Sequence, residues 1–93
     1  MRSVTKKIKD AFDNQKSRKI GNTETDGQTV WLHGNAIVKR DDKGKVWVSL
    51  AGWNTPTTRE RVNGITGIGF HQHKFEACID GKPASATDWH PVN

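Results

Sequence analysis

The sequence predicts an α+β fold made of an N-terminal helix, a three-stranded antiparallel meander, a short helix and a C-terminal β-hairpin. Near the N-terminus, apolar residues recur every three to four positions, which is typical of an amphipathic helix. From residue 29 they alternate with polar residues, and a Thr-Pro pair then interrupts that alternation. The 93 residues are predicted to form a single small domain: a helical segment (1–15), a loop (16–28) and a sheet-containing core (29–93).

The first predicted element is an amphipathic helix over residues 3–14. Its apolar stripe consists of Val4, Ile8, Ala11 and Phe12, and Ser3 is a candidate N-cap. The polar back of this helix has two interpretations. It is either a solvated face or, with the cations that follow the helix, a patch that faces phosphates; that patch would contain Arg2, Lys6, Lys9, Lys16, Arg18 and Lys19.

The next segment, residues 16–28, is predicted to be a connecting loop because it is polar and contains turn formers, including Gly21 and Gly27. Three antiparallel strands are then predicted at residues 29–33, 36–40 and 45–51, with Gly34-Asn35 forming the first turn.

Alternation along these strands predicts one core face. That face carries Val30, Leu32, Ile37, Val46, Val48 and Leu50. The opposite face is either a platform on which unpaired bases stack or a second core layer; it carries Trp31, His33, Val38, Arg40, Trp47 and Ser49.

The third strand leads into a short helix predicted over residues 56–63. Thr55 is a good N-cap, Pro56 suits the first turn, and Gly64 suits the residue that ends a helix. A capping box of Thr57 with Glu60 is an alternative start.

The corner before this helix is the best candidate site in the sequence. A helix N-terminus has free N–H groups and a partial positive charge, so it suits an anion. On this interpretation an indole and two guanidinium groups point outward; the residues delivered there are Trp53, Thr57, Thr58, Arg59 and Arg61. The alternative is structural, with the indole attached to the core and the threonines capping the helix.

A final hairpin is predicted from residues 68–72 and 75–79 around a turn at His73-Lys74. Phe75 is expected on its apolar face, together with Ile68, Phe70, Ala77 and Ile79. Pro83 is expected to end regular pairing, Trp89 to anchor the tail on the core, and the chain to fray beyond Pro91.

Charge and composition narrow the function classes. Fifteen Lys and Arg against ten Asp and Glu, a net charge of +5, favour nucleic acid or another acidic partner. A single cysteine, Cys78, excludes an intrachain disulfide and favours a reducing cytoplasm. No apolar run reaches membrane-spanning length, and the N-terminus lacks the apolar region of a signal peptide.

Catalytic and metal-binding motifs are weak. His71 and His73, with Glu76 and Cys78 nearby, form the one metal-like cluster, but His73 falls in a predicted turn. No nucleophile has a base placed beside it by spacing, and no phosphate-loop pattern occurs. We therefore expect no enzyme, no metal and no cofactor.

Three runs of residues resemble small proteins encoded by tailed bacteriophages. They are residues 21–27 (GNTETDG), residues 32–37 (LHGNAI) and residues 51–61 (AGWNTPTTRER). The resemblance implies a phage origin and a role inside the infected bacterium, in the host cytoplasm. It implies no site residue.

The function expected from these observations is a non-enzymatic phage accessory protein that binds nucleic acid through a basic and aromatic surface. The candidate binding residues are Trp53, Thr57, Thr58, Arg59, Arg61, Lys6, Lys9 and Arg40. The alternative is an inhibitor or modulator of a host protein, such as RNA polymerase or a defence nuclease, since exposed Trp and Arg are favoured at protein interfaces. A homo-oligomer is compatible with either function.

Overall fold

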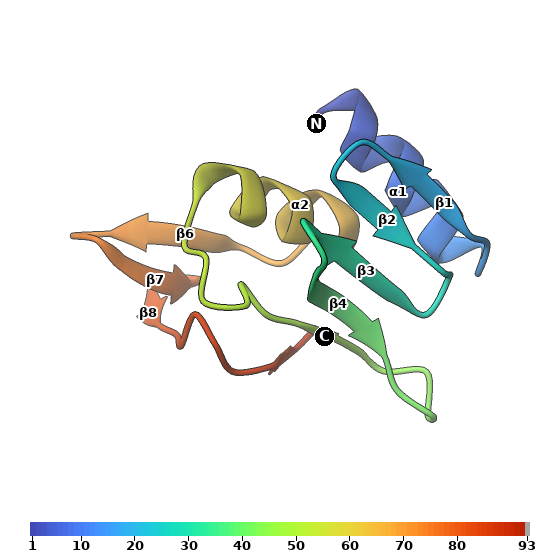
Figure 1. Cartoon of the computed structure of the whole chain (residues 1–93). Coiled ribbons are helices and arrows are strands. Elements are labelled where there is room, and N and C mark those ends of the chain that lie inside the picture. The colour runs from blue at the N-terminus through green and yellow to red at the C-terminus, as the bar shows by residue number, and fades with distance from the viewer. Residues whose placement is uncertain (93) are drawn as a thin grey trace.

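Residues 1–92, which the computed structural model describes, form two helices and two antiparallel sheets (Figure 1). This confirms the predicted α+β class. Helix α1 (Ser3–Asp13) is followed by β1 (Arg18–Ile20), β2 (Thr23–Thr25), β3 (Thr29–Leu32), β4 (Asn35–Arg40) and β5 (Val46–Val48). Helix α2 (Pro56–Thr66) then leads to β6 (Phe70–His73), β7 (Glu76–Ile79), β8 (Lys82–Pro83) and β9 (His90–Pro91).

Helix α2 lies at the centre of the molecule, where it contacts α1, β4 and β6 (Figure 1). The larger sheet has the strand order β1-β2-β3-β4-β5-β9, and α1 packs on β1 and β2. The smaller sheet contains β6, β7 and β8. The C-terminal hairpin therefore forms a sheet of its own and does not extend the meander.

Helix α1 lies close to its predicted position. Ile8 and Phe12 are buried in the core, as the apolar stripe predicts. Ser3 does not cap the helix, because it is already the first helical residue; Arg2 occupies the cap position without a side-chain bond. Thr5 is also fully buried, although its polarity excluded it from the predicted stripe.

The predicted loop at residues 16–28 is wrong, because this segment contains β1 and β2. The inward positions of β2 are the threonines Thr23 and Thr25, both fully buried. They are satisfied by hydrogen bonds: Thr25 Oγ1 donates to the carbonyl of Thr29 at 2.7 Å, and Thr23 Oγ1 donates to Asn22 at 2.9 Å. Burial of hydroxyls instead of aliphatic groups removes the apolar alternation that signals a strand.

The central meander is present, but its register differs from the prediction. The chain turns at His33-Gly34, where both residues have positive φ, so Leu32 pairs with Asn35. A bulge between Val30 and Trp31 then shifts the pairing again.

The shifted register changes which side chains reach the core. Val38 pairs with Val30 on one side and Val48 on the other, and it is fully buried instead of lying on the opposite face. Val46, placed in the core by the sequence, is only half-buried. Ser49 is also buried, where its hydroxyl donates to the carbonyl of Thr87 at 3.2 Å.

Helix α2 begins as predicted and ends three residues later than predicted. Thr55 is the N-cap, and its Oγ1 accepts a bond from the Thr58 N–H at 3.2 Å, so the alternative capping box with Thr57 does not form. Gly67 ends the helix in the left-handed conformation. Gly64 instead allows α1 to approach, since a Cβ there would lie 2.5 Å from Cγ2 of Thr5.

The C-terminal hairpin turns at Lys74-Phe75, one residue beyond the predicted turn. Phe75 therefore lies at the tip, 91% exposed, and the prediction that it faces the core is wrong. Pro83 is the last residue of β8, a short strand that the sequence did not predict and that pairs with β7. The predicted fraying beyond Pro91 is also wrong for Val92, whose N–H bonds to the carbonyl of Val46 at 2.9 Å; Asn93 lies outside the described residues.

Candidate nucleic-acid interface

Trp53 agrees with the first of its two interpretations, in which the indole points outward. Its side chain is 58% exposed, whereas Trp31, Trp47 and Trp89 are half-buried. The Trp53 backbone is held on both sides, because its N–H bonds to the carbonyl of Leu50 at 2.8 Å and its carbonyl accepts from the N–H of Thr55 at 2.9 Å. An exposed indole therefore stands on a fixed backbone.

Two of the other tryptophans, Trp47 and Trp89, contact charged side chains of the fold. The Trp47 indole donates to the Asp41 carboxylate at 3.0 Å, and the Lys45 ammonium lies 5.4 Å from the centre of its ring. Trp89, predicted to anchor the tail on the core, is half-buried, and the Lys39 ammonium lies 4.2 Å from its ring centre. Of the two tryptophans predicted on the face opposite the core, Trp47 is thus engaged within the fold and Trp31 is half-buried.

Arg61 does not point outward, so the prediction that it lies at the surface is wrong. It lies on the inner face of α2 and is only 5% exposed. Its guanidinium donates to Thr23 Oγ1 at 3.1 Å, to Thr5 Oγ1 at 3.0 Å and to the Glu60 carboxylate. It therefore joins α2 to α1 and β2 and has no role in a surface site.

Glu60, which is half-buried, completes this network. Burial raises the pKa of Glu60, but hydrogen bonds from the Thr5 hydroxyl and the Arg61 guanidinium outweigh it and hold the pKa below the ordinary value of 4.5. The carboxylate is thus stabilised more in the folded chain than in the unfolded chain.

This lowered pKa gives a pH dependence of stability. The contribution of Glu60 is fully present above about pH 4.5 and is lost as the pH falls through its folded-state pKa. We expect the difference in unfolding free energy between the natural chain and Glu60→Gln to narrow below pH 4.5, as measured by urea denaturation at a series of pH values. A difference that stays constant with pH would contradict this assignment.

Arg59, Thr57 and Thr58 have three different environments. The Arg59 guanidinium is half-buried and donates to two neutral acceptors, Asn54 Oδ1 at 2.5 Å and Gln72 Oε1 at 3.1 Å, so its charge remains uncompensated. Thr58 is buried and serves the helix cap. Thr57 is half-buried beside a cavity.

Three other cations were predicted to bind the partner, and two of them instead contact groups within the fold. Arg40 donates to the carbonyls of Gly27 and Phe12 and lies 4.1 Å from the centre of the Phe12 ring. Lys9 forms an ion pair with Asp13. Lys6 remains exposed.

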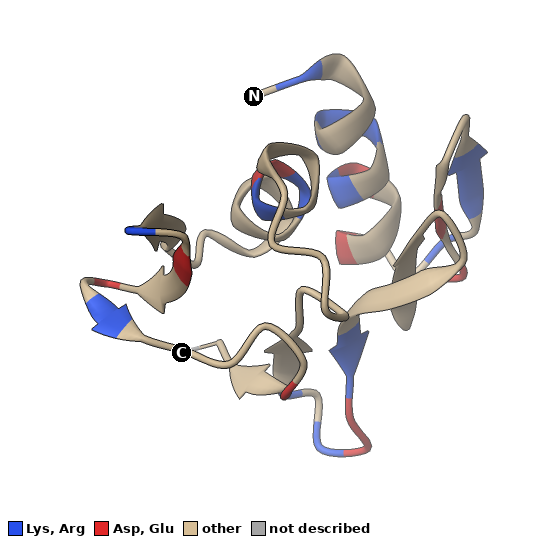
Figure 2. Ribbon diagram, turned by 60° about the vertical axis from the view of Figure 1, so that its left-hand side comes forward, with Lys and Arg blue, Asp and Glu red and all other residues tan. Residues whose placement is uncertain are grey.

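The net charge of the chain is concentrated at one end. Residues 1–20 contain seven Lys and Arg and two Asp, a net charge of +5, whereas residues 21–93 contain eight residues of each sign. Figure 2 shows the resulting basic segments on α1 and β1. Six of these cations are exposed and belong to neither ion pair found within residues 1–92; we call them the basic edge: Arg2, Lys6, Lys7, Lys16, Arg18 and Lys19.

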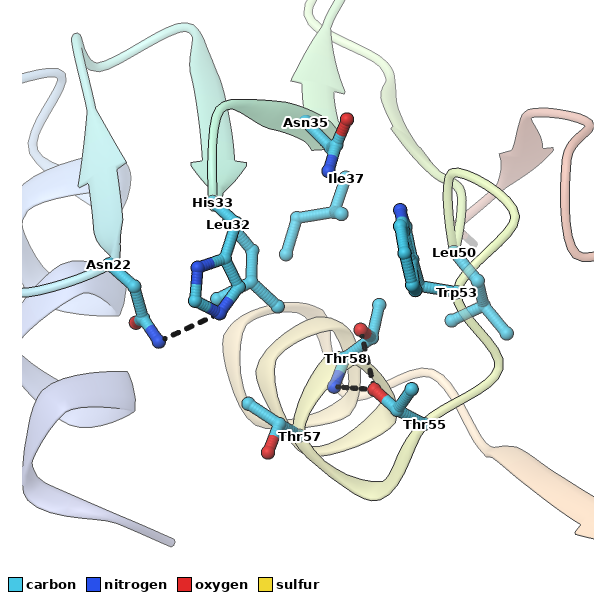
Figure 3. A pocket seen from close by; sticks show the side chains of 10 residues that line it. All are labelled: Asn22, Leu32, His33, Asn35, Ile37, Leu50, Trp53, Thr55, Thr57 and Thr58. Atoms are coloured by element: carbon cyan, nitrogen blue, oxygen red, sulfur yellow. Dashed lines mark hydrogen bonds between the residues drawn. The ribbon is translucent and has the colours of Figure 1, made fainter.

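A cavity of about 550 Å³ opens beside Trp53 (Figure 3). Its apolar lining comes from Leu32, Ile37 and Leu50. Polar groups line it from two directions: the first turn of α2 on one side, and Asn22, His33 and Asn35 on the other. Sequence reasoning missed this cavity because its two walls come from residues 22–37 and 50–58, which are separate segments of the chain.

Comparison with known proteins gives one positive result. The family model of the Kyanoviridae Gp96 protein matches residues 1–92. The chain belongs to the Kyanoviridae Gp96 family. This confirms the resemblance to small proteins of tailed phages. No curated protein and no solved structure matches the Gp96-family chain.

Residues 1–92 of the Gp96-family chain contain neither a cluster of metal-ligating side chains nor a membrane-spanning helix. No group of three or more His, Cys, Asp or Glu side chains is placed to hold a metal ion within residues 1–92. His71 and His73 are exposed on β6, and Cys78 is buried on β7. Neither α1 nor α2 has the length and apolar character needed to cross a membrane.

Proposed function

We propose that this Gp96-family chain is a non-enzymatic phage accessory protein that binds nucleic acid in the host cytoplasm. The observation that supports it best is the basic edge, where six exposed cations lie within the first 20 residues without an ion-pair partner. The repulsion among these like charges falls when they contact phosphates, and the counterions released from the nucleic acid favour binding.

The basic edge has a defined support within the fold. Helix α1 packs on β1, so cations from the helix, from the connection after it and from the first strand lie on neighbouring elements (Figure 2). Lys6 and Lys7 belong to α1, and Lys19 belongs to β1. Their separation in the sequence thus does not separate them into different parts of the molecule.

Two further residues support the proposal from the other side of α2. Arg59 keeps an uncompensated charge, and Trp53 offers an exposed ring. Arg61, Arg40 and Lys9 have no part in it, because their charges are used within the fold.

The proposal is tested by two charge-matched triple variants. We expect Lys6→Ala/Lys7→Ala/Lys19→Ala to weaken binding of a labelled oligonucleotide at low salt by about tenfold or more, since each lysine supplies a phosphate contact. The control, Lys43→Ala/Lys74→Ala/Lys82→Ala, removes the same charge from exposed positions elsewhere, and we expect a change of about twofold or less. Fluorescence anisotropy measures both affinities, and thermal melting checks that both variants fold.

Equal losses in the two variants would contradict a localised interface. No binding to single-stranded or duplex oligonucleotides at low salt would contradict the proposed function altogether. That second result would favour a modulator of a host protein, for which Trp53 and Phe75 are the exposed aromatic residues suited to an interface.

A further inference from the structure

The cavity beside Trp53 has the form of a binding site for a flat ring. Leu32, Ile37 and Leu50 provide apolar surface, and the Trp53 indole stands along one side of the opening (Figure 3). Its volume of about 550 Å³ falls within the roughly 300–1,000 Å³ typical of small-molecule sites. A planar group inserted there would stack on the indole.

The indole is preorganised for that contact. Ala51 and Gly52 both have positive φ and turn the chain so that Trp53 follows the turn directly. The Gly52 N–H bonds to the carbonyl of Ala86 at 2.8 Å, which ties this turn to the C-terminal segment. A ring that is already held in place loses little freedom when a ligand stacks on it.

Polar atoms in the lining suit the edge of a heteroaromatic ring. Asn22 Nδ2 and His33 Nε2 are 3.2 Å apart and orient each other. The Asn35 amide and the Thr57 hydroxyl also line the cavity, and neither makes a side-chain hydrogen bond within residues 1–92. An asparagine amide both donates and accepts, which is the pattern needed to read the edge of a nucleobase.

The cavity is connected to the basic edge through one hairpin. Asn22 lies in the turn between β1 and β2, and Lys19 lies on β1. A strand whose base enters the cavity can therefore continue along a segment that carries the cations of the basic edge.

From these observations we propose that the cavity binds a single nucleobase, stacked on Trp53 and contacted at its edge by Asn35. This inference rests on the proposed function and specifies it. Because a base inside a duplex is already stacked and paired, a site for a single base implies a preference for single-stranded nucleic acid. The same ring chemistry could come from a free nucleoside, so the test includes both sources.

The test uses the full chain and four variants. Binding of a labelled oligothymidylate of about fifteen nucleotides, and of a duplex of the same length, is measured by fluorescence anisotropy. We expect Trp53→Ala to weaken single-strand binding by about fivefold or more, while duplex binding changes by about twofold or less. Trp53→Phe should retain most of the affinity, and Trp53→Leu, which keeps apolar bulk without a flat ring, should not.

The matched control is Phe75→Ala, since Phe75 is the other highly exposed aromatic ring and lies away from the cavity, at the tip of the β6–β7 hairpin. Unchanged single-strand affinity in both Trp53→Ala and Trp53→Leu would overturn the cavity assignment. The proposed function would still stand if the lysine variants weaken binding. Equal losses of single-strand affinity in Trp53→Ala and Phe75→Ala would also overturn the cavity assignment.

The second arm titrates free thymidine and adenosine by isothermal titration calorimetry, because replacing Trp53 would remove its own fluorescence signal whether or not the nucleoside binds. A saturable heat that is lost in Trp53→Phe and Trp53→Ala alike would overturn stacking, because phenylalanine still offers a ring. A saturable heat that is lost only in Trp53→Ala, without binding to any oligonucleotide, would uphold the nucleobase site and reject the proposed function.

Discussion

Replacement of Arg61 by alanine is expected to lower the free energy of unfolding by about 3 kcal/mol. The substitution leaves the Glu60 carboxylate without its cation and the hydroxyls of Thr5 and Thr23 without their shared donor. The Arg61 side chain is 6% exposed and that of Glu60 23%, so we expect a loss at the lower end of the roughly 3–5 kcal/mol typical of breaking a buried ion pair. That is a large share of the roughly 5–15 kcal/mol by which a domain is stable. Urea denaturation monitored by circular dichroism measures the loss.

Arg59→Ala is the matched control on the same helix. Its guanidinium is half-buried with neutral partners, so we expect a loss of about 1 kcal/mol or less. The oligonucleotide affinity of folded Arg61→Ala should stay within about twofold of the natural value. A small loss of stability with a large loss of affinity in Arg61→Ala would return this residue to the surface site and contradict its buried role.

The Gly27→Ala variant is expected to lose about as much stability as Arg61→Ala, roughly 3 kcal/mol, for two combined reasons. Gly27 has a φ of +94°, which side chains rarely adopt. An added Cβ would also lie 2.6 Å from the carbonyl carbon of Gln15, which is backbone and cannot rotate away. The substitution therefore forces apart the C-terminal end of α1 and the turn that precedes β3.

Gly44→Ala separates the two causes. Gly44 also has a positive φ, +80°, but a Cβ there would meet nothing within 4 Å, so only the backbone strain remains. We expect a loss of about 1 kcal/mol. Thermal or urea unfolding of the two variants side by side measures the difference. Equal losses of unfolding free energy would show that the contact with Gln15 does not contribute to the destabilisation.

The sequence was informative where aliphatic periodicity and turn chemistry carry the fold. The stripe that contains Ile8 and Phe12 predicted α1, and Thr55-Pro56 predicted the start of α2, because these patterns act over a single turn. The same reasoning failed for β1 and β2. Thr23 and Thr25 are polar residues buried with their hydroxyls hydrogen-bonded, so β2 lacks apolar alternation, and one partner of Thr23, Arg61, lies 38 residues away, outside any local window.

The predictions of strand register and of the end of α2 were wrong for a related reason. Val38 reaches the core because of a bulge on the neighbouring strand, and Gly64 stays inside α2 because another helix needs the space. Both outcomes depend on tertiary contacts. The local sequence does not distinguish a glycine that ends a helix from a glycine that allows another helix to pack closely.

The candidate site shows the same division. The exposed position of Trp53 was one of two interpretations that the sequence left open, whereas the basic N-terminal segment was visible as a charge pattern. The burial of Arg61 could have been anticipated from its spacing, since it lies three residues after Thr58 and four before Ile65, on the face that carries Val62. The cavity could not, because it requires β2, β3, β4 and α2 to come together.

The claim on which this account depends is that the basic edge contacts phosphates. The salt dependence of oligonucleotide affinity, measured between about 50 and 200 mM salt for the natural chain and for Lys6→Ala/Lys7→Ala/Lys19→Ala, tests it most directly. We predict that affinity falls steeply with salt and that the triple variant reduces the slope of log K against log salt by about 2. An affinity that does not vary with salt, or a slope that is the same in both proteins, would contradict it.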